Sequence, residues 1–156
     1  MRILGIDPAL TTLGWGIIEA RSPRIGFISS GLIKTKTDKE LYQRLSHITT
    51  GIRSVINQYQ PEAVAMEITF LNNNAASSLK LAYVRGAIMT IIGELQLPYY
   101  EYSPNQIKKT LVGLGHAQKE QIKYMLKVIL AGFNNSISLD EADALAAAYT
   151  CFTNMK

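Results

Sequence analysis

The first third of the chain alternates between short hydrophobic runs and polar turns. The runs cover residues 2–7 (RILGID), 13–19 (LGWGIIE) and 25–34 (IGFISSGLIK), and Pro8 stops the first of them directly after Asp7. Short apolar runs bounded by Pro, Ser and Thr are typical of strands, and short links between them favour antiparallel pairing. We therefore predict that the chain opens with an antiparallel meander of three strands.

The pattern changes to a helical period at residue 39. Between residues 39 and 59 the apolar positions recur every three or four residues along one face of a helix, which Pro61 closes. Residues 63–68 (AVAMEI) then indicate a fourth strand, with Glu67 near its end. A strand that follows a helical crossover is expected to lie parallel to its neighbour in the sheet.

The next predicted helix, at 75–95, is amphipathic at first and then apolar on nearly all sides. Such a helix has to be covered on two faces. One face can lie on the sheet, and the other can be either a subunit interface or the contact with a neighbouring helix of the same chain. The sequence leaves both alternatives open.

The remaining segments complete an α/β pattern. Residues 98–102 (PYYEY) indicate a fifth strand, and helices are expected at 104–111, 118–130 and 139–152. The whole order, β-β-β-α-β-α-β-α-α-α, predicts a mixed five-stranded sheet flanked by helices. A length of 156 residues without repeats, low-complexity tracts or a linker predicts a single domain over residues 1–156.

Composition narrows the class of protein. Apolar residues make up 47% and charged residues 18% of the chain, which is typical of a globular domain. The longest apolar stretch, at 86–93, is too short to span a bilayer, and the charged N-terminus is a poor signal peptide. The lone Cys151 excludes an internal disulfide and suits a reducing compartment. We expect a cytoplasmic protein without a membrane partner.

The net charge of +4 understates how basic most of the surface is if several acids gather at one site. A basic surface around an acidic pocket suits a phosphate polymer, because the surface attracts the backbone while the pocket holds cations. A basic balance is also ordinary in a small protein, so the charge alone does not decide between these alternatives.

The last predicted helix carries two acids near its start. Ser138 and Glu141 fit a capping box, which gives Glu141 a structural role. Asp140 and Asp143 are three residues apart and therefore share one helical face. The helix dipole alone could account for Asp140. Asp143 precedes the apolar run ALAAA, so we expect it beside a packed surface, where an acid needs a partner.

Two further acids, Asp7 and Glu67, lie at or near the ends of predicted strands. Strand ends in α/β sheets commonly line a ligand crevice, although Asp7 could equally be a turn acid and Glu67 an edge charge. Together with Asp140 and Asp143 they supply enough oxygen ligands for two Mg²⁺ ions. Such a pair of ions can activate a water and stabilise the leaving oxygen of a phosphodiester.

Basic residues recur on both sides of a glycine loop at 113–115. They are Lys108, Lys109, Lys119, Lys123 and Lys127. The last three are spaced every four residues and form one stripe, which suits nucleic-acid binding but also an ordinary solvated helix face. Phe70, three residues after Glu67, could stack on a base or fill the core.

Segments along nearly the whole chain, taken in order, resemble the RuvC-type Holliday junction resolvases. They are ILGIDP, SSGLIKT, QPEAVAMEITF, NNAASSLKLAYVRGAI, IKKTLVGLGHAQKEQI and DEADALAAA. GIDP alone is weak, because related phosphotransfer folds share it, whereas the ordered set is specific. The resemblance implies an RNase H-like fold and a Mg²⁺-dependent endonuclease. Such an enzyme nicks two opposed strands of a four-way DNA junction and leaves 5′-phosphate and 3′-hydroxyl ends.

The same resemblance assigns roles to individual residues. The residues that match the family's catalytic, metal-binding acids are Asp7, Glu67, Asp140 and Asp143. The candidate DNA-binding residues are Phe70, Lys108, Lys109, Lys119 and Lys123. We expect two Mg²⁺ ions per subunit, with Mn²⁺ as a substitute. The resemblance further implies a homodimer with the long central helix at its interface, and a branch-migration motor is a candidate partner.

The chain departs from the family pattern at a few positions. Ala9 stands where a Gly usually follows Asp-Pro, Ile68 replaces a polar or acidic residue, and the region after DEADALAAA is short. Two other functions are consistent with the residues. One is a non-catalytic junction-binding protein with the same fold, and the other is an RNase H-like nuclease that acts on other branched DNA or on RNA.

Overall fold

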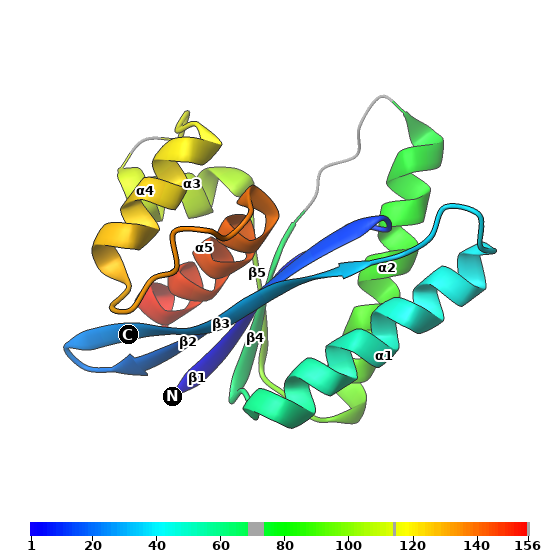
Figure 1. The fold of residues 1–156 in the computed structure, drawn as a ribbon, viewed down its shortest axis with the longest axis horizontal. Helices are drawn as coiled ribbons and strands as arrows, with labels where there is room; N and C mark the ends of the chain where they lie inside the picture. The colour runs from blue at the N-terminus through cyan, green and yellow to red at the C-terminus, as the bar shows by residue number, and fades with distance from the viewer. Residues whose placement is uncertain (69–73, 114, 156) are drawn as a thin grey trace.

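The computed structural model describes residues 1–68, 74–113 and 115–155. Within these ranges, five strands form one sheet in the order β3-β2-β1-β4-β5 (Figure 1). The strands are β1 (Arg2–Asp7), β2 (Thr12–Arg21), β3 (Arg24–Lys34), β4 (Ala63–Glu67) and β5 (Tyr99–Tyr102). The helices are α1 (Leu41–Tyr59), α2 (Ala75–Glu94), α3 (Pro104–Val112), α4 (Lys119–Ile129) and α5 (Leu139–Asn154). The predicted fold class and element order are confirmed.

The pairing of the strands brings Asp7 and Glu67 to one edge of the sheet. β1 pairs antiparallel with β2, and β2 with β3, which confirms the predicted meander. β4 runs parallel to β1, with Ile6 opposite Met66, and β5 runs parallel to β4. Asp7 and Glu67 are the next residues along these two parallel neighbours, so both acids lie at the same end of the sheet.

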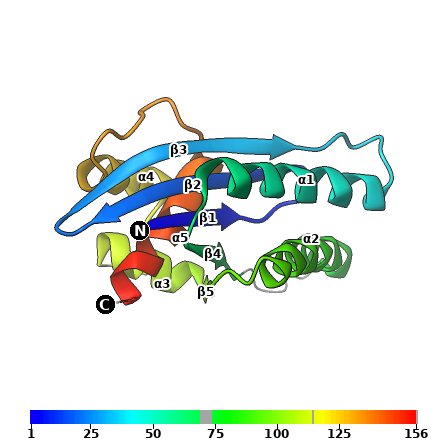
Figure 2. The same cartoon turned by 90° about the horizontal axis from the view of Figure 1, so that it is seen from below.

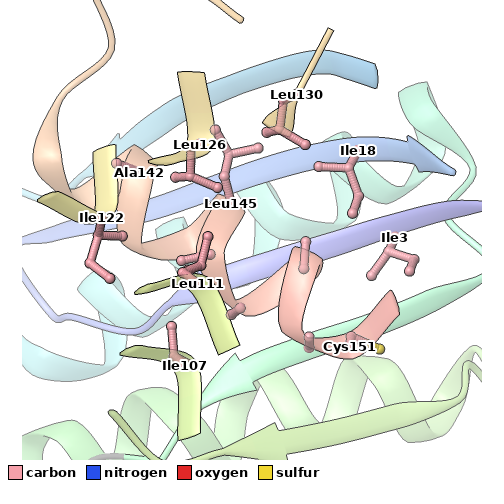
Figure 3. Close-up of a cluster of buried hydrophobic side chains, with 14 of the residues drawn as sticks. Ile3, Ile18, Ile107, Leu111, Ile122, Leu126, Leu130, Ala142, Leu145 and Cys151 are labelled. Carbon is pink, nitrogen blue, oxygen red and sulfur yellow. The ribbon is translucent and has the colours of Figure 1, made fainter. Parts of the chain in front are cut away.

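Helices cover both faces of the sheet (Figures 1 and 2). α1 and α2 lie on one face, where Leu4 and Ile52 belong to one buried cluster. α3, α4 and α5 lie on the other face, where a second cluster includes Ile3 and Leu145 (Figure 3). Successive residues of β1 thus enter different clusters, as a strand buried on both faces requires.

Most elements differ from the prediction by one or two residues at their ends, and α1 and β2 show two of the reasons. α1 begins at Leu41 rather than at residue 39, because Glu40 has an extended backbone (φ −62°, ψ 150°) and forms a capping box with Gln43. β2 continues to Arg21, beyond the expected end at residue 19, because its pairing with β3 extends to the pair Arg21 and Arg24. Hydrophobic periodicity reports neither a cap nor a pairing partner.

Helix α2 is covered on one side and open on the other. Val84 and Ile88 are among its buried residues, which pack with α1 and the sheet. Leu79 and Tyr83 remain 52% and 45% exposed, so a neighbouring helix of the same chain covers only part of the apolar surface. The apolar stretch at 86–93 is too short to cross a membrane, but the whole of α2 is long and apolar enough to do so. Length and composition are weak evidence for a membrane span, because core helices of soluble proteins meet the same two criteria.

Candidate active site

Three of the four predicted acids converge at the end of β1. One carboxylate oxygen from each of Asp7, Asp140 and Asp143 lies within 4.8 Å of the others. Asp7 is the last residue of β1, while the other two acids belong to the start of α5 and are about one helical turn apart. The group therefore forms where the start of α5 meets the end of β1.

Glycines on β1 and β2 allow α5 to lie this close to the sheet. A Cβ atom at Gly14 would lie 2.2 Å from the carbonyl oxygen of Asp140, and one at Gly5 would lie 1.8 Å from that of Ala144. Gly14 also pairs with Asp7 in the β1–β2 register. A larger residue at either glycine would push the first turns of α5, and their acids, away from Asp7. The hydrophobic pattern gave no sign of this packing role.

Glu67 faces the same cavity without joining the closest group. The cavity has a volume of about 160 Å³, and its wall includes Asp7, Glu67 and Asp143 together with Lys108 and Lys119. The structure thus brings all four predicted acids to one end of the sheet. Three of them form a tight cluster, and Glu67 lies beside it.

Arg85 of α2 holds the end of β4 in place. Its Nη1 donates a hydrogen bond of 2.7 Å to the backbone carbonyl oxygen of Glu67. Its Nη2 forms an ion pair with Glu101 on the neighbouring strand β5. The Tyr99 hydroxyl donates a hydrogen bond of 2.6 Å to the same Glu101 carboxylate. The role of Arg85 was not predicted, because no local motif connects a residue in the middle of a helix with a strand end 18 positions earlier.

Burial and mutual repulsion oppose ionisation of the acids. Burial, and then the charges of Asp143 and Glu67, raise the pKa of Asp7 to about 8. Burial, and then the charge of Asp143, raise the pKa of Glu67 to about 7. Burial also raises the pKa of Asp143, although the hydrogen bond and charge of Lys119 oppose the shift. A cation in the cavity would favour the ionised carboxylates.

Lys119 supplies part of this compensating charge. Its Nζ lies 2.5 Å from Oδ2 of Asp143. Burial alone would lower the pKa of Lys119, but the hydrogen bond and the charge of Asp143 raise it overall. Lys108 is half-buried in the same cavity wall, and its charge opposes the rise in the pKa of Glu67. Both lysines therefore line the cavity that contains the acids.

The other predicted DNA-binding residues do not line the cavity or lie outside the described residues. Lys109 is exposed and does not line the cavity. The Nζ of Lys123 donates a hydrogen bond of 2.6 Å to the carbonyl oxygen of Ile137. Two members of the predicted lysine stripe, Lys119 and Lys123, thus contact residues at or just before the start of α5. Phe70 lies outside the described residues.

Glu141 takes the structural role that the sequence indicated. Its Oε2 accepts a hydrogen bond of 2.7 Å from the backbone N–H of Ser138, whose Oγ accepts one of 3.2 Å from the N–H of Glu141. The Ser30 hydroxyl on β3 also donates to Glu141 at 2.9 Å, a contact that was not predicted. Burial alone would raise the pKa of Glu141, but these hydrogen bonds lower it overall. The capping box is confirmed.

The cluster of acids fits a hard divalent cation. Asp7, Asp140 and Asp143 present carboxylate oxygens, which are the ligands that Mg²⁺ and Ca²⁺ prefer. Among the described residues no His or Cys joins the group, so its donors do not favour zinc or copper. The high pKa of Asp7 is the expected property of crowded carboxylates without a counter-ion. These residues can therefore hold a metal ion.

The sheet order, the two helical layers and the acids at the ends of β1 and β4 define an RNase H-like protein of the resolvase class. The yeast mitochondrial Holliday junction resolvase Ydc2 shares this fold, with a TM-score of 0.68 over 95% of this chain and 77% of that one. At 11% sequence identity this likeness concerns the fold alone. More similar proteins identify the family.

The chain belongs to the family described as crossover junction endodeoxyribonuclease RuvC, whose model matches residues 3–151. A relative of that name from Rickettsia bellii (strain RML369-C) is 48% identical over 151 residues, which are 97% of this chain and 96% of the relative. The structure of Thermus thermophilus RuvC in complex with a Holliday junction substrate has a TM-score of 0.91 and 31% identity. That match covers 99% of this chain and 96% of the other. The resemblance drawn from the sequence is confirmed.

Proposed function

We propose that this chain is a structure-selective endonuclease that resolves four-way DNA junctions by paired, Mg²⁺-dependent nicks in opposed strands. The products carry 5′-phosphate and 3′-hydroxyl ends. The observation that carries the proposal is the cluster of Asp7, Asp140 and Asp143, with Glu67 beside it, in a member of the crossover junction endodeoxyribonuclease family. The Thermus thermophilus relative, which is bound to a Holliday junction substrate, supports the choice of substrate.

The four acids are proposed to hold two Mg²⁺ ions per subunit, with Mn²⁺ as a substitute. When bound, such ions activate a water and stabilise the leaving oxygen of a phosphodiester. The chain contributes by keeping the oxygens of Asp7, Asp140 and Asp143 within 4.8 Å of one another before the substrate arrives. Lys108 and Lys119, in the cavity wall, are placed to orient the phosphate that is cut.

Other residues are proposed to bind DNA and to pair two subunits. Lys109 and Lys123 contact the DNA backbone away from the phosphate that is cut. Phe70 stacks on a base near the junction. Because paired nicks need two active sites, we infer a homodimer that buries the exposed apolar side of α2. A branch-migration motor is a further candidate partner. The buried free thiol of Cys151 is compatible with the expected cytoplasmic location.

A cleavage assay with and without Mg²⁺ tests this function. The substrates are a four-way junction, a replication fork, a linear duplex and an RNA–DNA hybrid, all in the same buffer. We expect Mg²⁺-dependent, symmetric nicks in the four-way junction. The Asp7→Asn variant should lose cleavage and keep junction binding, because it loses a metal ligand without losing the basic surface.

The matched control is Glu62→Gln, which makes the same carboxylate-to-amide change at an exposed position. Glu62 accepts a hydrogen bond from the N–H of Arg2, at the opposite end of β1 from Asp7. This variant should cut like the wild type. Junction binding without nicking by the wild type would favour a non-catalytic binder. Preferred cleavage of the hybrid or fork would favour a related nuclease, and cleavage by Asp7→Asn would contradict the role of the acids.

A further inference from the structure

A second basic surface lies on the α1–α2 side of the sheet, whereas Lys108 and Lys119 belong to α3 and α4 on the other side (Figure 1). Its centre is a cavity of about 360 Å³, at the end of β3 and the start of α1, that contains no acid in its lining. The basic residues of this lining are Lys34, Lys36, Lys39, Arg44 and His47. Figure 2 shows this end of β3 at the opposite end of the β2–β3 ribbon from the hairpin turn.

A neighbouring hollow connects this cavity to the active-site end of β1. It has a volume of about 300 Å³ and is lined by residues 8–11, which directly follow Asp7, and by Lys80 of α2. Arg44 lines both hollows, so the two adjoin at this residue and together make up one depressed region of the surface. We call this depression the basic track and define its cationic residues as Lys34, Lys36, Lys39, Arg44 and Lys80.

Arg44 fixes the shape of the basic track. Its Nε donates to Oγ1 of Thr35 and its Nη2 to Oγ1 of Thr11, both at 2.9 Å, and Nη2 also reaches the carbonyl oxygen of Leu10 at 3.4 Å. The Thr35 hydroxyl donates to the same carbonyl at 2.5 Å. These contacts join the loop after Asp7 to the end of β3. They are all with neutral oxygens, so they leave the positive charge of Arg44 uncompensated.

The lysines of the basic track are also without acidic partners in the part of the chain that the structure describes. The cations of the ion pairs there are the amino terminus, Arg2, Arg21, Arg53, Arg85 and Lys119. None of Lys34, Lys36, Lys39 or Lys80 is among them. Asp38 and Glu40 lie in the same segment, but neither lines the cavity, and Glu40 caps α1. Unpaired cations along a depression suit a linear polyanion.

We propose that the basic track binds the phosphodiester backbone of the DNA arm that leaves the active site past Pro8. The inference rests on the proposed function, because the acids then mark the point at which the DNA is cut. A strand at that point has Lys108 and Lys119 on one side and the basic track on the other. The four acids would repel DNA on their own, and cations on both sides hold the backbone over them.

The test compares two double variants that each remove two positive charges from the full-length protein. Lys36→Gln/Lys39→Gln alters the basic track, and Arg21→Gln/Arg24→Gln alters the hairpin turn at the far end of the same two strands. Both are made in the Asp7→Asn background, so that binding is measured without cutting. Affinity for a four-way junction is measured at several salt concentrations.

We expect the basic-track variant to bind the junction roughly tenfold more weakly than its Asp7→Asn parent. The slope of log Kd against log salt should fall by about 1 to 2, because each lost phosphate contact lowers this slope by about 0.9. The hairpin variant should keep the parental slope. Lys36→Arg/Lys39→Arg should restore the slope, because it keeps both charges. Equal slopes for the basic-track and hairpin variants would overturn the proposal. It would also be overturned if Lys36→Arg/Lys39→Arg bound the junction no better than Lys36→Gln/Lys39→Gln.

The same experiment separates this inference from the proposed function. The Asp7→Asn protein is the parent of both double variants. If this parent binds the junction and the wild type nicks it, the proposed function stands. If the basic-track variant then keeps the salt dependence of the parent, only the role of the basic track is refuted. A parent that did not bind the junction would refute both. Circular dichroism and thermal unfolding of each variant identify any loss of affinity that comes from misfolding.

Discussion

Asp7 is the residue on which the opposing forces at the active site are easiest to follow. Burial and three neighbouring carboxylates, Asp143, Glu67 and Asp140, all disfavour its charged form, and only Lys119 opposes them. The acid is nevertheless needed as an ionised ligand if a metal is to bind. Burial and repulsion therefore both disfavour the ionised carboxylates in the metal-free protein, and a bound cation would offset both.

Burial and this repulsion together make the stability of the metal-free protein depend on pH. The pKa of Asp7 in the folded state, about 8, lies above its ordinary value of 3.8. A raised pKa stabilises the folded state at low pH, and this contribution is lost as the pH rises from about 4 to about 8. We predict that in EDTA the chain loses stability over this range and that excess Mg²⁺ restores part of it at pH 8 to 9. Each pKa unit corresponds to about 1.4 kcal/mol, so urea unfolding can detect the effect.

The variants Asp7→Asn and Asp38→Asn test the origin of this dependence. Asp7→Asn cannot ionise, so it should lose less stability than the wild type between pH 5 and pH 9 and should gain less from Mg²⁺. Asp38 is exposed and lies outside the cluster, so Asp38→Asn should follow the wild type. Parallel curves for Asp7→Asn and the wild type would show that burial and the neighbouring carboxylates do not raise the pKa of Asp7 as the structure indicates.

At the scale of elements, the site depends on how closely α5 packs on β1. We predict that Gly5→Ala destabilises the fold by about 1–3 kcal/mol, which is typical of overpacking, and reduces cleavage. The reason is that a Cβ atom at Gly5 would lie 1.8 Å from the carbonyl oxygen of Ala144, so α5 must move. Urea unfolding and the junction cleavage rate measure the two effects.

Gly93→Ala is the control for this substitution. Gly93 lies in α2 with nothing near the position of an added Cβ atom. Alanine there should be neutral or stabilising by up to about 1 kcal/mol, because Gly is the poorer helix former. If Gly5→Ala were as stable and as active as Gly93→Ala, the close approach of α5 would not be what positions the acids.

The second link between elements is Arg85, which connects α2 to the end of β4. We predict that Arg85→Gln slows junction cleavage roughly 10- to 100-fold and raises the Mg²⁺ concentration needed for half-maximal rate. The reason is that the Glu67 carbonyl loses its hydrogen bond and the acid is less well positioned. Junction affinity should be unchanged, since Arg85 is largely covered, with 15% of its side chain exposed.

Arg53→Gln is the matched control, because it breaks a comparable Arg–Glu pair at a more exposed position. Arg53 of α1 pairs with Glu94 of α2, and both side chains are close to half exposed. Such a pair contributes at most about 1 kcal/mol. Arg53→Gln should keep the wild-type rate and Mg²⁺ dependence. A Mg²⁺ dependence of Arg85→Gln that matched this control would refute the positioning role.

At the scale of the whole molecule, the exposed side of α2 predicts how subunits cooperate. Tyr83→Glu places a charge in the exposed apolar surface that we propose as the dimer interface, so it should convert the dimer to a monomer in sedimentation experiments. A monomer nicks one strand at a time. On a plasmid with an extruded cruciform, the variant should therefore accumulate nicked circles, whereas the wild type produces linear DNA.

Val128→Glu tests whether any exposed apolar residue would serve as well. Val128 is 64% exposed on α4, away from α2, and its variant should remain dimeric and linearise the plasmid. A dimeric Tyr83→Glu would place the interface elsewhere, and a monomeric wild type would contradict the proposed dimer.

The sequence alone determined the elements and the local roles of several residues. Strand and helix periods, Pro8 and Pro61 as breakers, and the capping box of Ser138 and Glu141 depend on residues a few positions apart, so they are visible in the chain itself. The ordered motifs also singled out the four acids and the family. The predicted bounds were wrong by one or two residues at the ends of elements. Glu40, for example, was predicted to lie inside a helix, whereas it is the N-cap of α1.

Only the tertiary structure decided which of these residues meet. The β1–β4 register brings Glu67 beside Asp7, Gly5 and Gly14 admit α5, and Arg85 ties β4 to a helix 18 residues later. The basic track likewise joins segments from β3, α1 and α2. These contacts depend on how strands align and how closely helices approach them, and neither property is written in the period of a single segment. The sequence thus named the four acids, and the β1–β4 register together with the packing of α5 on β1 placed them at one site.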